Sequence, residues 1–209
     1  MAQVPADLHE PFTSRARQRE AIVFALWIFL ASELLLFGGL FLGYATYRLL
    51  DIRDFNEAAS HTNVYFGTAN TAILMTSSLA IAVAGRALES GRTKPTKIGI
   101  WLTILLGLSF LVVKGFEYRE DLIEHLWPNL DFSLKPPVAR IFFSFYWITT
   151  GVHACHVSVG LLLIGRLAWM AHRRVLPQNR DSVEATSLYW HLVDIIWVIL
   201  YPLLYLVGR

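Results

Sequence analysis

The sequence predicts an all-α integral membrane protein, a bundle of five transmembrane helices. Apolar residues make up 55% of the 209-residue chain and charged residues only 16%, well below the roughly 25% that is typical of soluble domains. The apolar residues are concentrated in five runs. Each run reaches the roughly 20 helical residues that are needed to cross a bilayer core of about 30 Å.

The five predicted helices are separated by polar segments. They cover Ala21–Arg48, Val64–Leu88, Lys97–Glu117, Ala139–Ala171 and Thr186–Val207. Residues 1–20 are predicted to form a cytoplasmic N-terminal segment, and residues 21–209 a single five-helix membrane domain. The segment Asp51–Asn63 is short and of mixed charge, which indicates a polar connection. Ala80 and Ala84 have the spacing of a close helix contact, and Pro202 is expected to loosen or kink the last helix.

Basic residues predict the orientation of the chain in the membrane. Eleven of the eighteen Lys and Arg residues fall on the side of the N-terminus, namely Arg15, Arg17, Arg19, Arg86, Arg92, Lys94, Lys97, Arg166, Arg173, Arg174 and Arg180. Cytoplasmic loops carry the excess of Lys and Arg. The N-terminus is therefore expected in the cytoplasm and the C-terminus on the periplasmic or extracellular side.

Glu33 lies near the middle of the first predicted helix, with apolar neighbours on both sides. A charge near the bilayer centre costs at least about 2.5–3.5 kcal/mol, so such residues usually face protein or water. Two interpretations are consistent with this position. Glu33 is either a proton-linked carboxyl or a neutral carboxyl that hydrogen bonds between helices.

His153 and His156 share one face of the fourth predicted helix, because residues three apart are neighbours on a helix. One interpretation is that they bind a metal or ligate a heme, together with His191 from the last helix. The other is that neutral imidazoles hydrogen bond between helices. The second is favoured, because no carboxylate or cysteine accompanies the pair at matching spacing.

Five other polar or aromatic residues stand out in the third and the last predicted helices. His191 and Asp194 share a face of the last helix, where the carboxylate can accept a ring N–H and form an internal pair. Glu117 is expected to end the third helix near the interface, either as a solvated carboxylate or as a capped or partner-facing one. Tyr189 and Trp190 lie near one end of the last helix, a position that is typical of an interfacial aromatic belt.

The motifs of self-contained active sites are missing from the sequence. It has no GxSxG, HExxH, Walker A or GxGxxG motif in a usable context, and its single cysteine makes neither an internal disulfide nor a CxxC site. The formal net charge of +2 comes without a basic, aromatic-rich patch for nucleic acid. No nucleic-acid partner is expected.

Stretches from all five predicted helices, in order, resemble the cytochrome c oxidase subunit III family. They read SELLLFGGLFLGYATYR, NTAILMTSSLAIAVAGRALESG, GFEYRE, TGVHACHVSVG and EATSLYWHLVDIIWVILY. The resemblance puts Glu33 on the family's membrane-embedded glutamate, Asn70, Thr71 and Ser78 on polar positions of the next helix, Glu117 and Tyr118 on the pair ending the third, His153 and His156 on the two-histidine helix, and Glu184, Tyr189, Trp190, His191, Asp194 and Trp197 on the last helix. The five-helix bacterial form is the one that is matched, without the first two helices of the seven-helix form. The lipid-holding cleft between those two helices and the rest is therefore not carried over intact, and it is either completed by another subunit or missing.

This resemblance implies a non-catalytic subunit of a bacterial heme-copper terminal oxidase, in the inner membrane, whose donor is cytochrome c or quinol. Such a subunit holds no heme, copper or other metal. It packs against subunit I, which holds the hemes and copper, and it supports proton uptake and catalytic lifetime. Subunit II, a small subunit IV and bound phospholipid are further expected partners. The alternatives are an accessory subunit of a nitric oxide reductase-type complex and a heme-binding membrane protein.

Overall fold

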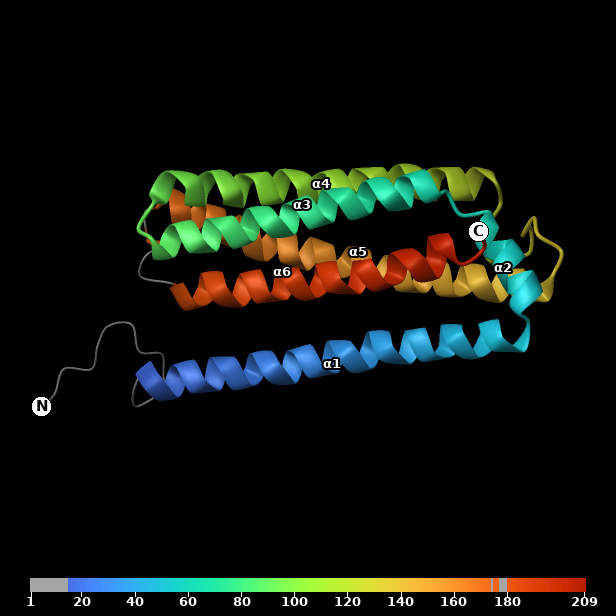
Figure 1. Cartoon of the computed structure of the whole chain (residues 1–209), viewed down its shortest axis with the longest axis horizontal. Helices are drawn as coiled ribbons and strands as arrows, with labels where there is room; N and C mark the ends of the chain where they lie inside the picture. Colours follow the sequence, from blue (N-terminus) through green and yellow to red (C-terminus); the bar gives the residue numbers. More distant parts are fainter. Residues whose placement is uncertain (1–14, 174, 177–179) are drawn as a thin grey trace, which may run out of the picture. The chain divides into compact units, whose positions relative to one another are not determined.

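The computed structural model describes residues 15–173, 175–176 and 180–209, and every regular element among them is helical (Figure 1). The elements are α1 Arg15–Leu50, α2 Ile52–Ser60, α3 Val64–Glu89, α4 Thr93–Ile123, α5 Pro137–His172, α6 Arg180–Tyr201 and a π-helical turn, η2, Pro202–Leu206. Within the described residues, five helices are long and apolar enough to cross a membrane. The predicted all-α membrane architecture is confirmed.

The chain divides into two compact units, Met1–Gly39 and Leu40–Arg209. The first contains most of α1, including Glu33. The predicted first helix, Ala21–Arg48, is longer at both ends in the structure. The second unit contains the end of α1 and all the other helices.

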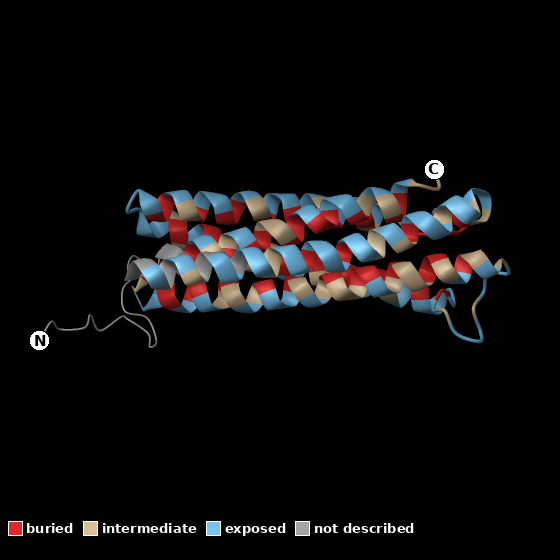
Figure 2. Ribbon diagram, turned by 90° about the horizontal axis from the view of Figure 1, so that it is seen from below, coloured by how far each residue is buried: buried red, intermediate tan, exposed pale blue. Residues whose placement is uncertain are grey.

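Four helices form the body of the second unit. α3 packs against α4 and α6, and α5 packs against the same two helices, so the four close into a ring. Figure 2 shows that their buried residues face one another while their outer surfaces are exposed. Large apolar side chains on these outer surfaces include Leu79, Leu105, Leu162 and Ile195. An outer surface of this kind suits contact with lipid, where every backbone polar group is satisfied within the helices.

The polar connection that was predicted over Asp51–Asn63 contains a short helix, α2. The Asp51 side chain caps it by accepting a hydrogen bond from the Asp54 N–H at 3.3 Å. Its apolar face, with Phe55 fully buried, packs against α5 and η2. The sequence pattern did not reveal this helix, because nine residues are too few for the length criterion of a membrane span.

α4 is longer than the predicted helix Lys97–Glu117, since it begins at Thr93 and ends at Ile123. Pro95 lies in its first turn, where the missing N–H would have had no helical partner in any case. At the other end the helix continues past Glu117. This extension corrects the expectation that Glu117 ends the helix.

The last helix changes form at Pro202, as the sequence predicts. α6 ends at Tyr201 and a π-helical turn follows. Two side chains from elsewhere in the unit bond carbonyls of this turn: the Tyr44 hydroxyl donates to the Leu203 carbonyl, and Thr62 Oγ1 donates to the Leu204 carbonyl at 3.0 Å. These contacts satisfy backbone acceptors that a regular helix would have bonded internally.

The predicted contact at Ala80 and Ala84 is confirmed. These residues face Gly99 of α4 so closely that a Cβ on Gly99 would lie 2.8 Å from the Ala84 Cβ and 2.8 Å from the Ala80 carbonyl oxygen. Small residues on both helices therefore allow α3 and α4 to approach, as is common in membrane bundles.

Candidate functional site

A buried polar cluster lies at the C-terminal end of α4. We call it the lysine cluster, and its members are Lys114, Glu117 and Asp121 from α4, Tyr146 from α5 and Tyr205 from η2. The three α4 residues share a face because they are spaced three and four apart. Each of the five side chains is at most 5% exposed. The extended α4 and the turn after Pro202 together bring these groups into contact.

Lys114 is fully hydrogen bonded inside this cluster. Its Nζ donates to Glu117 Oε2 at 3.0 Å, to the Tyr146 hydroxyl at 3.1 Å and to the Tyr205 hydroxyl at 2.7 Å. An ammonium has three hydrogens to donate, so none is left over. The Nζ also lies 4.6 Å from the centroid of the Tyr146 ring and 4.9 Å from that of Tyr118. These ring faces attract the cation and offset part of the cost of burying it.

The two tyrosines connect the lysine to the carboxylates. The Tyr205 hydroxyl donates to Glu117 Oε1 at 2.6 Å. The Tyr146 hydroxyl lies 2.8 Å from Glu117 Oε1 and 2.8 Å from Asp121 Oδ2. Glu117 is therefore the hub of the cluster, and Asp121 joins it only through Tyr146.

Sequence reasoning singled out Glu117 and Tyr118 but missed Lys114 and Asp121. Lys114 was treated as one of the basic residues outside the membrane, although its run, LSFLVVKGF, is otherwise apolar. The available signal was the spacing of Lys114, Glu117 and Asp121, which puts three ionisable groups on one helical face. Tyr118 lies beside the cluster, where its hydroxyl is 2.8 Å from Thr150 Oγ1 and its ring stacks on Trp147.

His153 lies in a second polar region, in the middle of the bundle. Its ring is completely buried between Phe110 of α4, at 5.6 Å between centroids, and Trp197 of α6, at 5.1 Å. Neither of its ring nitrogens has a hydrogen-bond partner among the described residues. The favoured interpretation, hydrogen bonding between helices, is thus wrong for His153, whose contacts with α4 and α6 are ring contacts.

His156 has different surroundings although it shares α5 with His153. It is only partly buried, and its Nδ1 lies 2.8 Å from the Val152 carbonyl of its own helix. In the part of the chain that the structure describes, no group of three His, Cys, Asp or Glu side chains is placed to hold a metal.

The predicted pair of His191 and Asp194 is not formed. His191 Nδ1 instead lies 2.6 Å from Ser78 Oγ on α3. Asp194 lies beside the same serine, but neither of its oxygens makes a well-formed hydrogen bond with a described residue. The two residues do share a helix face. The hydrogen-bond partner of His191 is nevertheless Ser78 of α3, and not Asp194 as the sequence pattern predicts.

Tyr189 and Trp190 are buried between helices, which corrects their assignment to an aromatic belt. The Tyr189 hydroxyl donates to the His156 carbonyl at 3.0 Å, and Trp190 Nε1 donates to Ser77 Oγ at 3.0 Å. The Trp190 ring fills the space beside Gly160, where an added Cβ would lie 2.7 Å from it. α6 is therefore anchored to both α3 and α5 by large rings with polar tips.

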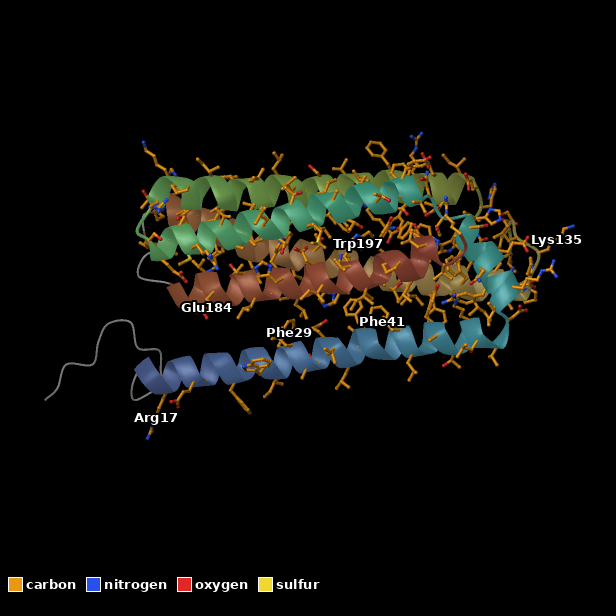
Figure 3. The ribbon with its side chains drawn as sticks, viewed as in Figure 1. Arg17, Phe29, Phe41, Lys135, Glu184 and Trp197 are labelled. Atoms are coloured by element: carbon orange, nitrogen blue, oxygen red, sulfur yellow. The ribbon has the colours of Figure 1, made fainter. Side chains whose placement is uncertain are left out.

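The polar positions of α3 bond mainly with α6. Trp197 extends from α6 toward α3, and its Nε1 donates to Thr71 Oγ1 at 3.0 Å (Figure 3). Asn70 is the exception: it is fully buried, and neither its Oδ1 nor its Nδ2 is hydrogen bonded within the described residues. Glu184 lies near the start of α6 and is exposed.

Comparisons with known proteins match almost the whole chain. Residues 12–209 match the family model described as cytochrome c oxidase subunit III. The cytochrome c oxidase subunit 3 of Thermostichus vulcanus is 31% identical over 90% of this chain and 88% of its own length. The heme-copper oxidase subunit I+III of Aeropyrum pernix is 32% identical over 95% of this chain and 24% of its own length. The cytochrome bo(3) ubiquinol oxidase subunit 3 of Buchnera aphidicola from Schizaphis graminum is 29% identical over 89% of this chain and 94% of its own length.

Proposed function

Because this chain belongs to the cytochrome c oxidase subunit III family and is subunit III of a heme-copper oxidase, we propose that it is the non-catalytic subunit that packs against the catalytic subunit I of a bacterial terminal oxidase. The observation that carries the proposal is the family match over residues 12–209. That match includes all five helices that can span a membrane within the described residues.

Direct packing against subunit I is supported by a relative in which the two are one chain. The Aeropyrum pernix relative is named as subunit I+III, and a fusion of this kind keeps the two subunits in the same complex. Subunit II, a small subunit IV and phospholipid are the other proposed neighbours. The exposed apolar surfaces of α3 to α6 are suited to such partners or to lipid.

The proposed role is to keep the catalytic subunit working, not to react with oxygen. The hemes and copper, which supply the redox chemistry, are assigned to the partner subunits. Relatives named for cytochrome c and for ubiquinol oxidases match this chain similarly, so we assign the choice of electron donor to another subunit. This subunit would sustain proton uptake and the lifetime of the catalytic centre.

We propose that the N-terminus is cytoplasmic and the C-terminus lies on the opposite side of the membrane. Eleven of the eighteen basic residues support this orientation. Of the other seven, Lys114 is buried in the lysine cluster and does not oppose it. Reporter fusions to the two termini would test the orientation. If a reporter that works only in the cytoplasm were active at the C-terminus, the proposed orientation would be contradicted.

Glu33 is the residue that we propose as proton-linked. Glu33→Gln keeps the shape of a protonated carboxyl, so the oxidase should assemble in normal amounts while its proton-linked turnover or its lifetime falls. In membranes, heme content measures the amount of assembled oxidase, and oxygen consumption per heme measures its turnover. Loss of the complex from the membranes would instead make Glu33 structural.

The experiment that tests the assembly is co-purification from native membranes. A C-terminal tag, with an N-terminal tag as its control, is used to isolate the chain in mild detergent, and the co-purifying proteins are identified by mass spectrometry. A large oxidase subunit rich in membrane helices and histidines is expected with either tag, and the accompanying subunit would identify the donor. Recovery of the chain alone with both tags, even in the mildest detergents, would contradict the proposal.

A further inference from the structure

The hydrogen bonds of the lysine cluster need one more hydrogen than its residues supply when they carry their usual charges. Lys114 and the two tyrosine hydroxyls have five hydrogens in total, but the structure has six short contacts among the five side chains. The shortfall falls on Tyr146. Its single hydrogen faces both Glu117 Oε1 and Asp121 Oδ2, each at 2.8 Å.

The charges of the lysine cluster lead to the same result independently. One lysine and two carboxylates would leave the buried cluster with a net negative charge. An uncompensated charge in a low-dielectric interior is costly, and such groups usually become neutral instead. One added proton gives every short contact a hydrogen and makes the cluster neutral.

We propose that the lysine cluster is a proton-binding site that holds one proton on Asp121, which donates to the Tyr146 hydroxyl. Tyr146 then accepts from Lys114 and Asp121 and donates its own hydrogen to Glu117. Glu117 needs no added hydrogen for its contacts, because Lys114, Tyr205 and Tyr146 all donate to it. Asp121 receives no other hydrogen bond from a described side chain, so the proton goes to Asp121.

Asp121 is the carboxyl of the lysine cluster that lies nearer the end of α4. Asp121 lies in the last turn of α4, and it is 5% exposed whereas Glu117 is 1% exposed. The titratable groups that interact with Asp121 are Lys114, Glu117 and Tyr118 from α4, Glu124 directly after α4, Tyr146 from α5 and Tyr205 from η2. This inference depends on the cluster alone and holds whether or not the proposed role in the oxidase is correct.

Infrared spectroscopy of the purified complex tests the proposal. Protein is prepared with aspartate labelled with ¹³C at its side-chain carboxyl, and the carbonyl stretch of protonated carboxylic acids is recorded in H₂O and D₂O at neutral pH. A labelled band that shifts in D₂O is expected in the wild type. This band should be absent from the H₂O-minus-D₂O difference spectrum of Asp121→Asn. It should be retained in that of Asp131→Asn, the matched control at an exposed position.

Assembly of the same variants gives a second, independent readout. Asparagine resembles a protonated aspartate and can donate to Tyr146 from its Nδ2, so Asp121→Asn should leave the amount of complex unchanged. Absence of any labelled protonated-acid band in the wild type would overturn the proposal. A band that persists in full in Asp121→Asn would overturn it as well, because the proton would then belong to another aspartate.

Discussion

The interior of the second unit contains two polar regions, the lysine cluster at the end of α4 and the neighbourhood of His153 in the middle of the bundle. In the lysine cluster every polar side chain is hydrogen bonded. Around His153, neither ring nitrogen has a hydrogen-bond partner among the described residues. The two regions lie close together along α5, because Tyr146 and His153 are about two helical turns apart.

The difference between these regions follows from charge. A buried ammonium must be paired and fully bonded, because leaving it unpaired costs several kcal/mol. A neutral imidazole that loses its bonds to water costs only about 1–3 kcal/mol, which ring packing can offset. His153 is held as an aromatic ring between Phe110 and Trp197, whereas Lys114 is held by its charge.

The largest effect is expected from removing the charge of Lys114. Lys114→Met leaves Glu117 buried without its cation and should destabilise the subunit by about 3–5 kcal/mol. The double variant Lys114→Met with Glu117→Gln removes both charges and should recover much of this loss. The measurement is the melting temperature of the purified complex. If Lys114→Met were as stable as the wild type, the claim that Lys114 is held by its charge would be wrong.

Removing the bridging hydroxyl should have the next largest effect. Tyr146→Phe leaves Asp121 without its hydrogen bond and takes one acceptor from Lys114, at a cost of about 1–3 kcal/mol. Tyr65→Phe is the control, since Tyr65 is 86% exposed. Equal melting temperatures for these two variants would show that the Tyr146 hydroxyl does not connect the cluster.

A comparable or smaller loss of stability is expected from crowding Trp190, which packs α6 against α5. Gly160→Ala would put a Cβ 2.7 Å from the Trp190 ring, and such overpacking costs about 1–3 kcal/mol. Gly151→Ala on the same helix is the matched control, because nothing lies within 4 Å of a Cβ there. The control should be neutral or stabilising by up to about 1 kcal/mol, and the account fails if both variants behave alike.

The smallest effect is expected at His153. His153→Phe keeps an aromatic ring between Phe110 and Trp197 and removes two unbonded nitrogens, so it should cost less than about 1.5 kcal/mol. His191→Phe, which loses the contact with Ser78, should cost more. A loss at His153 as large as that of Tyr146→Phe would contradict the comparison, because it would show that the ring nitrogens are hydrogen bonded in the complex.

The spans could be predicted from the sequence because a membrane helix needs a long apolar run, and α3 was predicted to within one residue at each end. The end of α4 could not, because Arg119 and Glu120 are exposed and look like the start of a loop. The helix extends because its buried face continues from Glu117 to Asp121. The short α2 was missed because its helix is stabilised by contacts with α5 and η2, which lie far away in the sequence.

Of the ionisable residues of the lysine cluster, the sequence pattern identified Glu117 but not Lys114 or Asp121, and it did not predict their hydrogen-bond partners. Charge in an apolar run identifies Glu117 and Asp194, but the partner depends on how helices are aligned with one another. Ser78 bonds His191 across 113 positions of sequence, and Lys114 meets Tyr205 only after the turn at Pro202. Spacing within one helix cannot supply such pairs.

The central claim, that this chain supports a catalytic partner and performs no redox chemistry itself, is tested most directly by oxygen consumption of the oxidase purified with and without it. Both preparations are matched for heme content, and the initial rate and the decay of activity during turnover are recorded. The account predicts heme-loaded enzyme with substantial initial activity that inactivates sooner when the chain is missing, and recovers its lifetime when the chain is added back. Complete loss of initial activity in heme-loaded enzyme without the chain, restored on its addition, would contradict the account.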